Sequence, residues 1–267
     1  AKAGVGAVAT QSFAKIEYGP EGLKLMEEGL TAQEALERLV EADSGRAVRQ
    51  VGMVDANGNT AVHTGKKCIE FAGHKTGKQY TVQANIMASP TVWPLMAMTF
   101  ETTNGDLADR MMSALETAQS EGGDLRGKQS AAILIVSGKP TGTPWKDVVM
   151  DLRVEDHPEP LKQLRRLIRI HRAYQHANKG DYYTEIGDVE NALIEYNLSS
   201  GFYPENPELK YWTAVTLAGK GRLEEALPMF KEVFHKAPQL KILTPRIAPS
   251  GLLPDDKEML DKIINME

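Results

Sequence analysis

The chain has 267 residues, of which 42% are hydrophobic and 25% are charged, and its formal net charge is −5. This composition is typical of a globular protein with one large domain or two smaller ones. The small negative charge and the lack of a run of Lys or Arg argue against a nucleic-acid partner. No stretch reaches the roughly 18 consecutive apolar residues of a transmembrane helix, so we expect no membrane span.

Cys68 is the only cysteine, which excludes an intrachain disulfide and a zinc site built from several thiolates. The first residues lack the charged-then-apolar layout of a signal peptide. The sequence leaves both a cytoplasmic and an exported location open. The histidines show no metal-ligand spacing, and the sequence has neither a P-loop nor a dinucleotide fingerprint. We therefore expect no metal and no cofactor.

The first third of the chain predicts one strand, two helices and a hairpin. Residues 5–10 form a short apolar strand, and residues 21–40 carry apolar side chains mostly at helical spacing. Thr31 and Glu34 have the spacing of a capping box, which places the start of the second helix. Two β-rich runs flank Asn57-Gly58, the strongest short-range signal for a hairpin.

Further elements follow in the same alternation of strands and helices. Residues 80–85 predict a strand, and Pro90 opens a helix with Val92, Met96 and Phe100 on its apolar face. Asp106 is the expected N-cap of the next helix, whose inner face we assign to Leu107, Met111, Leu115 and Ala118. That helix should end at Gly122-Gly123.

Residues 131–136 read as a strand buried on both faces, with residues 148–154 as its partner. Hairpins and consecutive helix pairs favour an α+β fold in which helices cover sheets, rather than a doubly wound parallel fold. We place the boundary of this first domain at residue 158. Residues 159–267 form the second domain.

The second domain repeats itself with a period of 34 residues. The shift aligns Ala192 with Ala226, Tyr196 with Phe230 and Pro204 with Pro238. This period is typical of tetratricopeptide units, in which a small residue lets two helices approach closely. Two such repeats can cap the first domain or form a peptide-binding groove, and the sequence leaves both open.

The loop from Gly122 to Ser130 is the first candidate site. It leads directly into a predicted strand, and its glycines permit a close approach of backbone to a ligand. We expect Asp124 to hold an amine and Arg126 a carboxylate in a two-point grip. The alternative is a helix end in which Asp124 and Arg126 pair only with each other.

Asp156 and His157 follow a strand and precede Pro160. A carboxylate beside a histidine can tune a base. Adjacent residues of an extended chain point in opposite directions, however, so we favour a hydrogen-bonded turn at this position.

Several segments together resemble domain-of-unknown-function family 1028, which is placed with the N-terminal-nucleophile hydrolases. Some of its members carry a C-terminal extension described as peptidoglycan-binding. The resemblance covers nearly the whole chain and rests on segments 3–11, 18–23, 64–68, 82–85, 122–130 and 151–160.

The resemblance implies an αββα layered sandwich followed by an α-helical repeat tail, and an amide-bond hydrolase whose N-terminal Thr, Ser or Cys is the nucleophile. Asn85 would be an oxyanion donor, with Asp124, Arg126, Gln129 and Ser130 lining the substrate end. Members of the family begin about 30 residues earlier, and Ala1 has no attacking side chain. The resemblance therefore places the nucleophile upstream of this chain, with the N-terminal strands of the sandwich missing.

Two hypotheses about function remain. The first is an amidohydrolase or peptidase-like protein that acts on a small amide or peptide. The second is a non-catalytic protein that binds a peptide or a peptidoglycan fragment. The missing strands would leave a gap in the sandwich, so we expect that they form a separate chain, are lost to disorder or processing, or are replaced by a strand of a partner molecule. The last alternative gives a homo-oligomer, which is the partner that we expect.

Overall fold

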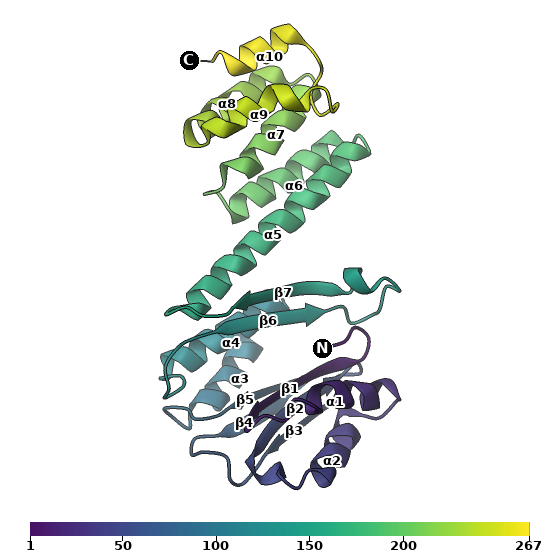
Figure 1. Cartoon of the computed structure of the whole chain (residues 1–267), viewed down its shortest axis with the longest axis vertical. Coiled ribbons are helices and arrows are strands. Elements are labelled where there is room, and N and C mark those ends of the chain that lie inside the picture. The colour runs from purple at the N-terminus through teal and green to yellow at the C-terminus, as the bar shows by residue number, and fades with distance from the viewer. Residues whose placement is uncertain (267) are drawn as a thin grey trace. The chain divides into compact units, whose positions relative to one another are not determined.

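A computed structural model describes residues 1–266 of the chain (Figure 1). The chain divides into two compact units, Ala1–Arg165 and a second that begins at Arg166. We call them the N-terminal unit and the helical unit. The boundary at residue 158 stays a prediction. No helix within residues 1–266 is long and apolar enough to cross a membrane.

The N-terminal unit is mixed α/β, with three small antiparallel sheets. Strands β1, β2 and β3 form the first sheet in that order, β4 pairs with β5, and β6 pairs with β7 (Figure 1). The elements are β1 (Gly6–Ser12), α1 (Tyr18–Glu27), α2 (Ala32–Ala42), β2 (Arg49–Asp55), β3 (Thr60–Thr64), β4 (Gly73–Gly77), β5 (Tyr80–Ala84), α3 (Val92–Thr102), α4 (Leu107–Ser120), β6 (Ala131–Val136) and β7 (Val148–Val154).

Strand β2 sends alternate side chains to two different environments, because successive residues of a strand point to opposite faces. Val51 and Met53 are fully buried in an apolar cluster with residues of α1 and α2. Gln50 and Gly52 point the other way, toward β5. A Cβ on Gly52 would lie 2.4 Å from Nε2 of Gln83, so only glycine lets the Gln83 amide approach β2 this closely.

Strand β5 alternates in the same manner. Tyr80, Val82 and Ala84 are buried in a second apolar cluster with residues of α3 and α4. Gln83 takes the opposite face and lies over β2. Polar side chains therefore occupy the space between the two sheets, and the apolar clusters lie on their outer sides.

The local signals that start helices and turns are confirmed. Thr31 and Glu34 form a reciprocal capping box at α2, and Asp106 accepts a hydrogen bond from the backbone N–H of Asp109 at the start of α4. The Asn57-Gly58 turn joins β2 and β3, with Gly58 at a φ of 85°. Strand β4 was not predicted, because its sequence Gly-His-Lys-Thr-Gly has almost no apolar residues.

One prediction about burial was wrong, and a second was wrong in part. In β6 only Ile133 is buried, and Leu134 is 39% exposed, because β6 pairs with β7 alone and keeps an open face. In α4, Met111 and Ala118 of the predicted inner face pack against the apolar cluster that α4 shares with α3 and β5, whereas Leu107 is 46% exposed. The buried residues of α4 are Ala108, Met112 and Ala114.

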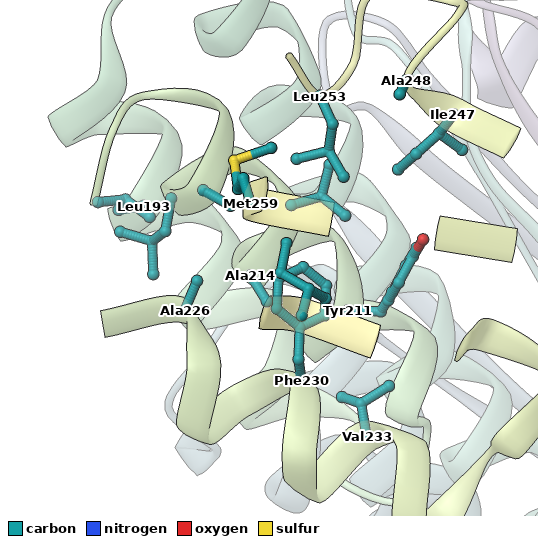
Figure 2. Packing of buried hydrophobic residues seen from close by; sticks show 14 residues of the cluster. Leu193, Tyr211, Ala214, Ala226, Phe230, Val233, Ile247, Ala248, Leu253 and Met259 are labelled. Atoms are coloured by element: carbon teal, nitrogen blue, oxygen red, sulfur yellow. The ribbon is translucent and has the colours of Figure 1, made fainter. Parts of the chain in front are cut away.

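The helical unit contains α6 (Val189–Phe202), α7 (Pro207–Gly219), α8 (Leu223–Lys236), α9 (Pro238–Ile247) and α10 (Lys257–Ile264), and the last part of α5 (Pro160–Glu185). Its core is apolar and is centred on Tyr211 and Phe230 (Figure 2). Ala192 and Ala226, the small residues of the 34-residue period, are both fully buried. The observed architecture is therefore a mixed α/β unit followed by a helical part.

Candidate functional site

The chain segment after β5 lies beside the loop after α4. The backbone N–H of Ala88 donates to the carbonyl oxygen of Gly123 at 2.9 Å, and that of Leu125 donates to Ile86 at 3.0 Å. Gly122 and Gly123 have φ values of 102° and 63°, which favour glycine and turn the chain at the end of α4. This short antiparallel pairing brings residues 85–88 next to residues 123–125.

A cavity of about 540 Å³ opens at this junction, and we call it the Asn85 cleft. The ends of β1 and β5, parts of α3 and α4, and the loop after α4 all contribute to it. Its lining residues are Gln11, Ser12, Phe13, Ile69, Gln83, Ala84, Asn85, Ile86, Met87, Met96, Leu115, Ala118, Asp124 and Arg126. Amide side chains and apolar side chains thus share one surface.

A second cavity of about 380 Å³ shares part of this lining, and we call it the Ser130 cleft. Asp124 and Arg126 line both clefts. The other polar side chains of the Ser130 cleft are Gln119, Lys128, Gln129 and Ser130. Of the predicted site residues, Asp124 and Arg126 line the Asn85 cleft together with Asn85. Gln129 and Ser130 line the adjoining Ser130 cleft.

Asp124 and Arg126 form a two-point ion pair. The Arg126 Nε donates to Asp124 Oδ1 at 3.0 Å and Nη2 donates to Oδ2 at 2.7 Å, while the Arg126 backbone N–H also donates to Oδ1 at 2.8 Å. The hydrogen bond from the Arg126 guanidinium holds the pKa of Asp124 below its ordinary value. Asp124 is therefore an anion at neutral pH. The Arg126 side chain is 71% exposed, so a ligand can reach it.

Two non-glycine residues of the Asn85 cleft have left-handed backbone conformations. Ser12 has a φ of 68° and Ile86 a φ of 58°, and the β-branched side chain of Ile86 makes this conformation unfavourable. Each such residue costs on the order of 1–3 kcal/mol and persists only where neighbouring contacts enforce it. At Ile86 the enforcing contact is the hydrogen bond from Leu125.

Two side-chain oxygens of the cleft are buried without a hydrogen-bond partner in residues 1–266. They are Oε1 of Gln83 and Oδ1 of Asn85. More than nine in ten buried polar atoms in proteins are paired, so each exception requires a reason. Both atoms are hydrogen-bond acceptors, and a ligand donor could pair with either of them only after the amide side chain turns toward the cleft.

The amide groups of the cleft connect to the space between the sheets. Gln11 Nε2 donates to Oε1 of Gln50 at 2.5 Å. Gln50 is fully buried, and its Nε2 lies 2.9 Å from Thr64 Oγ1 and 3.0 Å from the carbonyl oxygen of Ala84. Gln50 thereby fixes β5 immediately before Asn85.

Sequence reasoning missed Gln11, Ser12 and Gln83 as lining residues of the cleft. The signal for Gln83 was the alternation along β5, where polar residues at 81, 83 and 85 interleave with apolar residues at 80, 82 and 84. No local pattern could have found Ser12, because its place in the cleft depends on how β1 pairs with β2.

The Asp156-His157 segment forms a turn. Nδ1 of His157 accepts a hydrogen bond from the Glu159 backbone N–H at 2.9 Å, and the His157 backbone N–H donates to Gln129. Throughout residues 1–266 no group of three or more His, Cys, Asp or Glu side chains is placed to hold a metal ion.

Comparisons with known proteins point to one family. A crystal structure of a protein from Silicibacter pomeroyi that belongs to this family has a TM-score of 0.56 and 28% sequence identity to this chain. The similarity covers 68% of this chain and 74% of that one. No curated protein matches the chain. The family model that describes a "family of unknown function (DUF1028)" matches residues 1–164, and the chain therefore belongs to DUF1028.

Proposed function

We propose that the Asn85 and Ser130 clefts bind a small amide or peptide that carries a carboxylate, as the substrate-recognition part of an amide-hydrolysing protein of the N-terminal-nucleophile type. The observation that supports this most is Asn85, a residue with an unpartnered side-chain oxygen that lines one cleft with Arg126. An amide offers both an N–H donor and a carbonyl acceptor. The side chain of Asn85 can bind either group.

The packing of the N-terminal unit supports the fold part of this proposal. Residues of α1 and α2 cover one face of the β1–β3 sheet, β5 lies over its other face, and α3 and α4 cover β4 and β5. This is the order of layers expected for an αββα sandwich.

The positively charged side chains of the two clefts would bind the carboxylate end of the ligand. The planar guanidinium of Arg126 can hold a carboxylate at two points, and it already holds Asp124 in this manner. Ligand binding would exchange one carboxylate for another or extend the pair to a third group. Lys128 adds a positive charge to the Ser130 cleft, although Glu159 pairs with it at 2.8 Å.

Hydrolysis needs a nucleophile and a base in addition to these residues. Asp124 is a weak base because its pKa is lowered. The proposed mechanism instead assigns both roles to an N-terminal Thr, Ser or Cys, whose α-amine titrates near pH 8 and can accept the proton of its own side chain. Asn85 would then donate from Nδ2 to the developing oxyanion.

A non-catalytic protein that binds a peptide or cell-wall fragment is the second candidate. The lining of the Asn85 cleft favours it, because Ser12 is the only hydroxyl residue among those residues and no His, Lys or Cys lines the cleft with it to act as its base. We also propose that the helical unit is tetratricopeptide-like, since buried Ala192 and Ala226 recur at a spacing of 34 residues.

The chain offers a matched control for the role of Arg126. Arg153 forms the same two-point pair with Asp151, two residues before it, on the exposed strand β7. Arg126→Lys keeps the charge and loses the fork geometry, and so does Arg153→Lys. If the proposal holds, only Arg126→Lys weakens binding of N-acetyl amino acids measured by calorimetry.

The same ligands test hydrolysis. Release of free amino acid from N-acetyl amino acids is measured for this chain and for a longer form that begins with a Thr, Ser or Cys. Hydrolysis by the longer form alone supports the N-terminal-nucleophile mechanism. Binding without hydrolysis by either form supports the second candidate, and equal effects of both arginine variants would contradict the site assignment.

A further inference from the structure

The helical unit contains a cavity of about 530 Å³ that plays no part in the proposed function, and we call it the Tyr196 pocket. It is lined by the last turn of α5, by Tyr196 of α6, by the last two turns of α7 and by the loop at 251–252. All of these residues belong to the unit that begins at Arg166.

Tyr196 forms the buried wall of this pocket. The residue is 3% exposed, and its hydroxyl donates to Asp181 Oδ1 at 2.7 Å. Burial raises the pKa of Tyr196 to about 12, so the hydroxyl keeps its proton and remains a donor at neutral pH. A Cβ on Gly180 would lie 2.6 Å from the Tyr196 ring, which shows that glycine lets the ring lie directly on α5.

Two carboxylates lie along the α5 side of the pocket. Asp181 and Glu185 are four residues apart, which places them on the same face of the helix. Asp181 accepts the Tyr196 hydrogen bond, whereas no hydrogen bond or ion pair of the Glu185 side chain occurs within residues 1–266. Lys220 is the only cationic side chain among the lining residues that the structure describes.

Two helix C-termini add to this negative charge. Helix α5 ends at Glu185 and α7 ends at Gly219, and both of these residues line the pocket. The C-terminus of a helix carries a partial negative charge of about half an elementary charge, which favours a cation nearby. Together with Asp181 and Glu185, the two helix ends outweigh the single charge of Lys220.

An aromatic ring completes the lining. Trp212 of α7 is half-buried, and Val215 beside it in the pocket is 3% exposed. A tryptophan ring attracts a cation over its face, and apolar neighbours can hold the alkyl chain that bears the cation. We propose that the Tyr196 pocket binds an alkylammonium group, with Asp181 and Glu185 as its charge partners and Trp212 against its alkyl chain.

This chemistry has two sources, the lysine side chain of a peptide and a free alkyl diamine. Calorimetric titration of the full chain at low salt compares acetyl-Gly-Lys-Gly-amide with cadaverine. The neutral control ligand is the same peptide with norleucine in place of lysine. We expect the lysine peptide, cadaverine or both to bind, and the norleucine peptide to bind at least about tenfold more weakly, since it lacks the charge.

Glu185→Gln tests the site without disturbing Tyr196, because Glu185 is exposed. It should weaken binding of the cationic probe by roughly tenfold. Glu224→Gln makes the same charge change on exposed Glu224 of α8, outside the pocket, and should leave binding unchanged. Gly180→Ala, which displaces the Tyr196 ring, should also weaken binding.

The two probes identify the source of the ligand. Tighter binding of the lysine peptide supports a peptide ligand, and equal or tighter binding of cadaverine supports a free amine. The proposal is overturned if neither cation binds, if the norleucine peptide binds as well as the lysine peptide, or if Glu185→Gln and Glu224→Gln bind equally. None of these results depends on the Asn85 cleft.

Discussion

Gln50 is the fully buried side chain between β2 and β5 in the N-terminal unit, whereas Tyr211 and Phe230 hold the corresponding central place in the helical unit (Figure 2). The amide of Gln50 bonds to residues of β3, β4 and β5 and to Gln11 of β1, and the apolar clusters of that unit lie on the outer sides of its sheets. The helical unit packs one apolar cluster around its two aromatic rings.

The polar interior of the N-terminal unit and the apolar interior of the helical unit lead to binding sites in different places. A polar interior is costly unless every group is paired, and it positions polar side chains with little freedom to move. In the N-terminal unit the unpaired oxygens of Gln83 and Asn85 lie at the edge of that interior, where the Asn85 cleft opens. In the helical unit the Tyr196 pocket lies at helix ends and owes its charge to surface residues.

The largest expected effect is on the apolar interior. Phe230→Ala should lower the free energy of unfolding of the helical unit by about 3–5 kcal/mol, because it removes a fully buried ring and leaves a cavity. Urea denaturation followed by helical circular dichroism measures this. Ile242→Ala, at a 59% exposed position, is the control and should change the value by less than about 0.5 kcal/mol. Equal effects would contradict the assignment of the core.

The second largest loss of stability is expected in the polar interior of the N-terminal unit. Gln50→Ala leaves the carbonyl oxygen of Ala84 and the amide of Gln11 without their partner, and we expect a loss of about 2–3 kcal/mol. Thr213→Val removes a buried hydroxyl of the helical unit whose one hydrogen bond within residues 1–266 goes to Leu209 of its own helix, and it should cost about 1 kcal/mol or less. A larger loss of unfolding free energy for Thr213→Val than for Gln50→Ala would contradict this difference between the two interiors.

The sequence predicted the elements of both interiors better than their polar contacts. The capping box at Thr31 and the Asn57-Gly58 turn depend on neighbouring residues, so local patterns suffice to find them. The burial of Gln50 and the place of Ser12 in the cleft depend on pairing between distant strands, which a local pattern does not contain. The same reason explains why Leu134 was wrongly expected to be buried.

The sequence predicts Asn85, Asp124 and Arg126 as site residues, and all three line the Asn85 cleft. Their role as a site stays a prediction. The cleft residues from β1, Gln11 and Ser12, precede Asn85 by more than seventy residues in the sequence. Gln11 pairs with Gln50 and donates a hydrogen bond to it, and Gln50 in turn bonds the carbonyl oxygen of Ala84 in β5.

A third expected effect concerns the close helix contacts of the helical unit. Ala226→Leu should lower the free energy of unfolding by about 1–3 kcal/mol, because the larger side chain overpacks a fully buried position. Glu224→Leu, at an exposed position of the same helix, is the control. An unchanged melting temperature for Ala226→Leu would contradict the inference that the small residue of the 34-residue period is needed for close helix packing.

The smallest expected effect is electrostatic and belongs to the surface of the helical unit. Hydrogen bonds from Lys210 and Lys236 lower the pKa of Glu232 from 4.5 to about 2. A carboxylate with a lowered pKa stabilises the folded state above its unfolded pKa, and this contribution is lost as pH falls from about 4.5 toward 2. The Glu232 side chain is 42% exposed, so solvent screening limits the effect to about 1 kcal/mol or less.

Glu232→Gln should therefore be less stable than the unchanged protein at pH 6, and the difference should shrink at pH 3 and vanish near pH 2. Urea denaturation of both proteins at the three pH values measures this difference, and Glu258→Gln, which removes the more exposed Glu258–Lys262 pair of α10, is the control. Because added salt screens exposed ion pairs but barely affects apolar burial, the Glu232→Gln difference should also fall in 1 M NaCl, while the cost of Phe230→Ala should not. A Glu232→Gln difference that stays constant with pH would mean that the side chain contributes through packing of its stem rather than through its charge.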